Sequence, residues 1–103
     1  MSKCMSFLLK EVEITMLEVI TLNGPVEAIV KDIVQFTATV KNIGSVDAAT
    51  NVTFWENNSG TVISIQGTSL IPVGGTQNVS ISINTTGWGI GTYNICAKTS
   101  DEV

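Results

Sequence analysis

The sequence predicts an all-β fold, an antiparallel β-sandwich of six to seven short strands. Apolar and polar residues alternate with a period of two in several segments, which is the pattern of strands that bury one face. Each segment ends at residues that favour turns, such as Gly, Pro and Asn. One strand and its turn together take roughly 8–12 residues, which is the spacing typical of β-sandwiches.

The N-terminal third fits two patterns. Val12, Met16 and Val19 belong to a stripe with helical spacing, in a stretch of fair helix propensity. Val12, Ile14 and Met16 also alternate with polar neighbours, and β-branched residues favour strands. We expect strands here, with a helix as the alternative.

The centre of the chain gives clearer strands. Residues 33–42 (IVQFTATVKN) alternate throughout, and Gly44 and Ser45 end the segment. Residues 51–56 (NVTFWE) and 61–66 (TVISIQ) predict a hairpin, because the turn between them consists of Asn, Ser and Gly.

The last third adds two strands. Residues 77–84 (QNVSISIN) alternate without a break after the turn at 72–75 (PVGG). A glycine-rich turn at 87–91 (GWGIG) precedes the strand predicted at 92–98 (TYNICAK). The faces that point inward give the predicted core, which consists of Val34, Phe36, Ala38, Val40, Val52, Phe54, Val79, Ile81, Ile83, Tyr93, Ile95 and Ala97.

Charge and composition exclude several classes of function. Of the 103 residues only 14% are charged, with five lysines, nine acidic residues and neither Arg nor His. A nucleic-acid-binding protein needs clustered cations, so no nucleic acid is expected as a partner. The lack of His removes most acid–base catalysis near neutral pH and most zinc sites. We therefore expect no enzyme, no cofactor and no metal, and, without an apolar run of about 18 residues, no membrane insertion of this segment.

The two cysteines, Cys4 and Cys96, lie far apart and form no CxxC pair. A disulfide between them would close a loop worth about 4–5 kcal/mol in the chain-entropy model. Two reduced thiols are the alternative, because alternation directs Cys96 away from the core. The apolar residues 7–9 are too few for a signal peptide, so an export signal is expected in a longer parent chain.

Four segments carry motifs in a recognisable order. They are LEVITL, DIVQFTATVKNIGSVDAATNVTFWENN, LIPVGGTQNVSISI and GIGTYNICAKTSD. Within them lie a VxNxG motif at 40–44, a strand of the nVtv pattern at 52–54, a turn at 73–75 and a GxY motif at 91–93 before an Asp. With this order, residues 16–101 resemble the CARDB family, the cell adhesion related domain found in bacteria, which also occurs in archaeal surface proteins. Ig-like domains associated with α-galactosidases and S-layers share much of the pattern.

The resemblance implies a seven-stranded, Ig-like sandwich of the Greek-key type in an extracellular protein of the cell surface, without catalytic residues. Residues 1–15 would be an N-terminal extension or extra strand, and 16–103 the domain itself, part of a larger surface protein. Its partners would be neighbouring domains of the parent chain and a surface polysaccharide or protein. We therefore expect an adhesion or spacer module, with a carbohydrate-binding module and a strand-donation assembly module as alternatives.

The chain departs from the family pattern at 101–103, where a last strand would follow. That strand is expected to be missing or supplied from elsewhere. Residues 7–14 are either the last strand of a preceding domain or a strand that fills the vacant edge beside 92–98. An unfilled edge would present free N–H and C=O groups to another chain.

The candidate surface sites are four Asn-x-Ser/Thr sequons and two tryptophans. Trp55 and Trp88 could stack on a sugar ring, or Trp88 could close the end of the sandwich while a loop covers Trp55. Asp47 and Asp101 lack the spacing of a calcium loop. The sequons predict surface glycosylation, with accidental matches on an Asn/Thr-rich surface as the alternative, and begin at Asn51, Asn57, Asn78 and Asn84.

Overall fold

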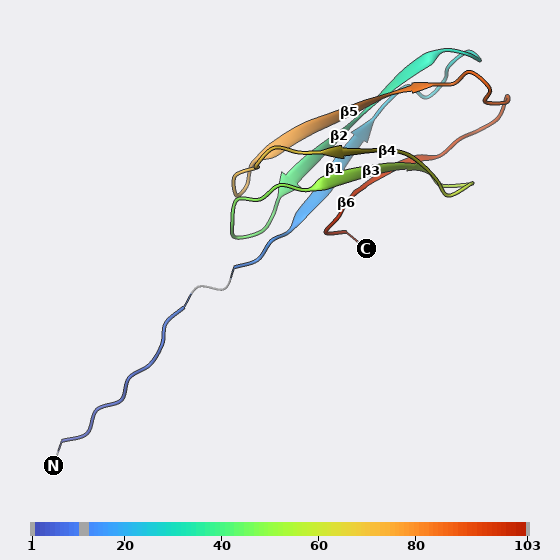
Figure 1. Ribbon diagram of the computed structural model, residues 1–103. Helices are drawn as coiled ribbons and strands as arrows, with labels where there is room; N and C mark the ends of the chain where they lie inside the picture. Colours follow the sequence, from blue (N-terminus) through green and yellow to red (C-terminus); the bar gives the residue numbers. More distant parts are fainter. Residues whose placement is uncertain (1, 11–12, 103) are drawn as a thin grey trace.

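Two three-stranded antiparallel sheets pack face to face in the computed structural model, which describes residues 2–10 and 13–102 (Figure 1). The strand order is β1-β2-β5 in one sheet and β4-β3-β6 in the other. The predicted all-β fold is confirmed. Among the described residues there is no helix long and apolar enough to cross a membrane. The strands are β1 (Leu17–Asn23), β2 (Ile33–Asn42), β3 (Asn51–Glu56), β4 (Thr61–Gly67), β5 (Thr76–Asn84) and β6 (Ile95–Thr99).

The strands of the central part lie where alternation predicts them. β2 and β3 have the predicted bounds, and β4 and β5 are each one residue longer. β6 begins at Ile95 instead of residue 92, which corrects the prediction. The reason is its partner: β3 ends at Glu56 and the chain then turns, so residues 92–93 lie beyond the last residue that could pair with them.

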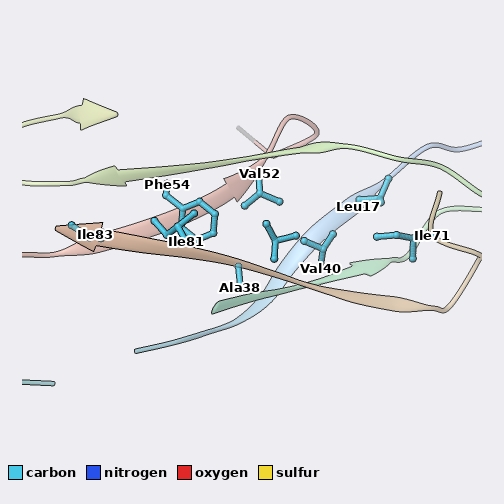
Figure 2. Close-up of a cluster of buried hydrophobic side chains, with 9 residues drawn as sticks. Leu17, Ala38, Val40, Val52, Phe54, Ile71, Ile81 and Ile83 are labelled. Atoms are coloured by element: carbon cyan, nitrogen blue, oxygen red, sulfur yellow. The ribbon is translucent and has the colours of Figure 1, made fainter. Parts of the chain in front are cut away.

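The core lies between the sheets and contains seven of the residues predicted for it. Figure 2 shows these side chains interleaving from both sheets. Leu17 and Ile71 were not predicted, and Ile71 is held in place by an isolated bridge with Ala48. The buried residues are Leu17, Ala38, Val40, Val52, Phe54, Ile71, Val79, Ile81 and Ile83.

Five predicted core residues are less buried than alternation implies. Val34, Phe36, Ile95 and Ala97 are half-buried and pack against the core from one end of the sandwich. Tyr93 is 42% exposed, so its assignment to the core was wrong. It lies in the turn before β6, outside any strand that would direct it inward.

A β-bulge interrupts the alternation of inward and outward side chains in β1. The register between β1 and β2 shifts between Val19 and Thr21. Leu17 and Val19 pack inward before the shift and Leu22 after it, so the inward positions change parity. The expectation of a strand over a helix is confirmed for β1, whereas the described residues before Leu17 form no strand.

Asn42, at the end of β2, is fully buried and joins three segments. Its side-chain amide donates to the carbonyl oxygens of Val46 (2.8 Å) and Ile71 (2.9 Å). Its Oδ1 accepts a hydrogen bond from the N–H of Gly44 (2.9 Å). Because the buried amide makes all these hydrogen bonds, it fixes the corner between the two sheets. The Asn of the VxNxG motif therefore has a structural role.

Gly44 is required because the chain that leads into β1 crosses it closely. A Cβ atom on Gly44 would lie 2.3 Å from the carbonyl oxygen of Ile14 and 2.8 Å from the nitrogen of Met16. The N–H of Ser45 donates to the Ile14 carbonyl (2.8 Å), and the N–H of Ile43 donates to the Met16 carbonyl (2.9 Å). These bonds fix the direction in which the residues before β1 leave the sandwich.

The difference in burial between two phenylalanines predicts a difference in stability. Phe54→Ala should lower the free energy of unfolding by about 3–5 kcal/mol, because Phe54 is fully buried. Phe36→Ala should cost clearly less, because Phe36 is only half-buried. Urea unfolding followed by circular dichroism measures both values, and equal losses would contradict the burial found here.

Removal of the Asn42 side chain should also destabilise the fold. Asn42→Ala leaves the carbonyl groups of Val46 and Ile71 without their side-chain donor, so a loss of about 2–4 kcal/mol is expected. The matched control is Asn78→Ala, because Asn78 is exposed and accepts a bond from Thr39 at the surface. The same urea experiment applies, and an Asn42 variant as stable as the Asn78 variant would disprove the role of the buried amide.

Candidate functional site

One edge of β6 is free over its first half. β6 pairs with β3 on one side and, among the described strands, with none on the other. The N–H of Asn57 donates to the carbonyl of Asn94 (2.8 Å), and the N–H of Ser100 donates to the carbonyl of Asn51 (3.0 Å). Because bonding directions alternate along an antiparallel ladder, these bonds direct the N–H and C=O groups of residues 95 and 97 toward the free edge.

The second half of β6 is covered by the start of β1. The hydroxyl of Thr99 donates to the carbonyl of Leu17 (2.6 Å), and the N–H of Leu17 donates to the Asp101 carboxylate (3.0 Å). The N–H of Val19 donates to the carboxylate of Glu102. Side chains therefore join β1 to the C-terminal segment, and this contact limits the free edge to the part of β6 that precedes Thr99.

An apolar groove of about 730 Å³ adjoins the free edge. It opens between the sheets at the end where β2 starts, because β1 pairs with β2 only as far as Thr37. Val34, Phe36 and Ile83 form its inner wall, and its one charged lining residue among those described is Glu27. Two loops form the rims and expose the large apolar side chains Val26, Ile29, Val30, Ile90 and Tyr93.

The two tryptophans lie in different surroundings. Trp55 projects from the outer face of β3, where the Lys98 ammonium lies 5.4 Å from its ring centroid. Trp88 packs against the core and lies 4.9 Å from the ring of Tyr93, whose hydroxyl donates to the Gly89 carbonyl (2.7 Å). Trp88 thus closes the end of the sandwich and lines the groove, whereas Trp55 lies outside it.

The cysteines and the asparagines of the predicted sequons differ in how far their side chains are exposed to solvent. Cys4 and Cys96 are free thiols, Cys4 exposed and Cys96 half-buried, so no disulfide joins them within the molecule. Within residues 2–10 and 13–102 no group of three or more His, Cys, Asp or Glu could hold a metal ion. The four sequon residues Asn51, Asn57, Asn78 and Asn84 are all exposed.

Residues 7–14 do not fill the free edge in the same molecule, which corrects one of the two expectations for this segment. Residues 7–10 are exposed and extend away from the sandwich (Figure 1), while 11 and 12 lie outside the described residues. Ile14 is held by Ser45, whose hydroxyl accepts its N–H (2.7 Å). Ser45 follows the end of β2 and the groove lies at the start of β2, so this contact keeps the segment away from the groove.

The groove itself was not predicted from the sequence. A signal was nevertheless present: residues 25–30 (PVEAIV) are apolar apart from Glu27, do not alternate and lie in a connection between two strands. A connection of this kind has no strand partner that would bury its side chains. An exposed apolar segment of this kind indicates a surface that binds another chain or molecule.

The comparisons with known proteins leave the family open. No protein-family model, curated protein or solved structure matches the chain. The resemblance to the CARDB family therefore stays a prediction from the motifs, and the free edge and groove of β6 are the features on which a function can be argued.

Glu56, at the end of β3, connects the hairpin turn to the segment before β6. Its carboxylate accepts hydrogen bonds from the N–H groups of Ser59 (2.9 Å) and Asn94 (2.7 Å). Burial by itself raises the pKa of this carboxyl, but hydrogen bonds from the backbone of Asn94, Ser59 and Asn58 outweigh it. The pKa of Glu56 therefore lies below its ordinary value of 4.5.

This depressed pKa predicts a loss of stability in acid. Glu56 contributes stability above its unfolded pKa of 4.5, and this contribution is lost as the pH falls through the lower folded pKa. Glu56→Gln should lower the free energy of unfolding at neutral pH and flatten its decline between roughly pH 5 and pH 3. Urea unfolding over that range tests this. The exposed Glu27→Gln is the control, and an unchanged slope in the Glu56 variant would contradict the assignment.

Proposed function

We propose that the chain is a non-catalytic structural module that binds polypeptide chains along the free edge of β6. It would serve as an adhesion or spacer domain of an extracellular, S-layer-type surface protein, with the Ig-like Greek-key topology of CARDB domains. The observation that carries the proposal is the apolar groove beside a strand edge with outward-facing backbone groups. A strand added there would satisfy those groups and cover the groove.

The geometry of the edge favours an extended polypeptide over a small molecule. Ile95 and Ala97 present N–H and C=O groups at the two-residue repeat of a strand, which another strand matches. The groove beside them would receive every second side chain of that strand. Each apolar side chain buried there contributes about 1.5–3 kcal/mol, so a segment with apolar residues at alternate positions fits best.

The outer face of the β2–β5 sheet is polar and suits a module that stays soluble between its neighbours. The hydroxyl groups of Thr37 and Ser80 share a hydrogen bond (2.7 Å), and Thr39 donates to Asn78 (2.8 Å). These pairs connect β2 and β5 on the solvent side. A glycan on Asn78 would stand on this face, in the sheet that does not contain β6, and would leave the free edge accessible.

Carbohydrate binding, the other candidate considered from the sequence, has less geometric support. A sugar site needs an exposed flat ring with polar groups around it. Lys98 covers one face of Trp55, and Trp88 is packed against the core and Tyr93.

Amide hydrogen exchange of the dilute chain tests whether the edge is free. The N–H groups of Ile95 and Ala97 should exchange about tenfold or more faster than those of Cys96 and Lys98, which point toward β3. The four amides are consecutive in one strand, so each neighbour is a control for local unfolding. Equal protection of all four, measured by NMR, would show that the edge is covered and would refute the proposed function.

A further inference from the structure

We propose that the strand accepted by β6 is the N-terminal segment of a second copy of this chain, so that copies join head to tail. The inference rests on the proposed function, because it needs the edge and groove to accept a strand. The donor segment consists of residues 2–10 of one copy, and the acceptor is the free edge with the groove of the next.

The donor segment is extended, apolar and uncovered. Met5, Phe7 and Leu9 are 96%, 86% and 87% exposed, and Leu8 is 83% exposed. A soluble protein rarely exposes so many large apolar side chains in one short segment unless they bind something. Burial of Phe7 and Leu9 alone would contribute about 1.5–3 kcal/mol each.

The donor segment does not lie over the groove of its own molecule. The molecule measures 85 × 23 × 18 Å, and its radius of gyration is 20.2 Å, compared with about 13 Å for a compact chain of this length. The segment leaves the sandwich just after the end of β2, where Ile14 meets Ser45, whereas the groove lies at the start of β2. Figure 1 shows the segment extending away from both sheets. A second molecule is therefore the partner that the segment can reach as it stands.

The donor sequence has the alternation that the acceptor needs. As a strand it places Met5, Phe7 and Leu9 on one face, which begins with Lys3, and Ser2, Cys4, Ser6, Leu8 and Lys10 on the other. The first face would enter the groove, whose wall is formed by Val34, Phe36 and Ile83. The second face would continue the outer surface of the β3–β6 sheet.

The contact between β1 and Thr99 restricts the register of pairing. An antiparallel donor with Cys4 opposite Cys96 places Met5 opposite Ile95, and Phe7 and Leu9 then continue along the groove. The backbone N–H and C=O groups of Cys96 point toward β3. Cys4 and Cys96 would therefore be a non-hydrogen-bonded pair of the new ladder, with Cα atoms about 4.5 Å apart. That separation lies within the range of roughly 4.4–6.8 Å found in disulfides, so the two natural thiols report on the register.

Charge is complementary between donor and acceptor. Lys3 and Lys10 are the charged residues of the donor segment, while the remaining chain has three lysines against nine acidic residues. In this register Lys3 lies opposite Ala97, toward the end of β6 that leads to Asp101, and Lys10 lies beyond the start of β6 on the outer face. The opposite net charges of donor and acceptor favour association in either strand direction.

The antiparallel direction joins unlike ends of successive copies. The donor would leave the acceptor at the groove end and enter its own sandwich at the end that carries Gly44. The groove end of one copy thus faces the Gly44 end of the next. Because each copy still offers a donor and an acceptor, the contact repeats from copy to copy.

Sedimentation velocity of the full chain under reducing conditions tests the assembly. The wild-type chain should form a concentration-dependent series of oligomers. Phe7→Ser should raise the dissociation constant about tenfold or more, whereas the control Leu8→Ser, equally exposed but on the opposite face, should change it little.

Acceptor variants test the other half of the contact. Ala97→Pro removes an N–H that points to the free edge and costs no bond to β3, so it should abolish assembly while the fold remains. Ile95→Lys is the second variant if the first fails to fold, as judged by circular dichroism. Phe7→Ser chains mixed with Ala97→Pro chains should form dimers and nothing larger, because one chain lacks the donor and the other the acceptor.

Oxidation tests the register. With oxidised glutathione, two thiols lose two protons and two electrons, the glutathione disulfide becomes two thiols, and a Cys4–Cys96 bond forms between copies. The wild-type chain should give a ladder on non-reducing gels, with Cys4 linked to Cys96 in peptide maps. Cys4→Ser and Cys96→Ser should each stop the ladder, and their mixture should give a Cys4–Cys96 dimer.

Each other outcome overturns a defined part of the inference. A monomer at all concentrations refutes strand donation between copies, and fast exchange at Ile95 and Ala97 would then leave the proposed function standing. Equal effects of Phe7→Ser and Leu8→Ser refute the assignment of the inward face. Cross-links between two Cys4 residues, without any Cys4–Cys96 bond, refute the register.

Discussion

The buried amide of Asn42 makes the two ends of the sandwich different. Its bonds to Val46, Ile71 and Gly44 fold the chain into a tight corner after β2. Gly44 is thereby held against the backbone of Ile14, where a Cβ atom would collide. The N-terminal segment must therefore leave at this corner, and the groove stays uncovered at the other end. The buried side chain of Asn42 thus helps to fix the corner where β1 begins, because Leu17 lies opposite Asn42.

β2, β3 and β5 were predictable because burial alternates along much of their length. β2 pairs with β5 without any irregularity, so the period of two in both segments survives in the structure. β1 was harder because its bulge changes the parity of the inward positions, and the site of a bulge depends on the partner strand. β6 is shorter than its own sequence indicates because β3 ends at Glu56.

The free edge of β6 could be expected from the sequence, but the groove could not. The resemblance led us to expect a vacant edge beside residues 92–98, and among the described strands β6 pairs with β3 alone. The groove arises where the loop at 25–30 and the segment at 88–93 meet at one end of the sandwich, and no local pattern records that proximity. Tyr93 shows the same limit: alternation places it inside, whereas its hydroxyl is bonded to Gly89 in a turn.

Hydrogen bonds between neutral groups hold the solvent side of β2 and β5 together. The Thr37–Ser80 and Thr39–Asn78 pairs carry no net charge. Dissolved ions weaken attraction between exposed charges, with a screening length that falls from about 8 Å at 0.15 M to about 3 Å at 1 M. They do not screen a bond between two hydroxyl groups in the same way. With only 14% of its residues charged, this sandwich is expected to lose less of its surface pairing in concentrated salt than a surface held by ion pairs would.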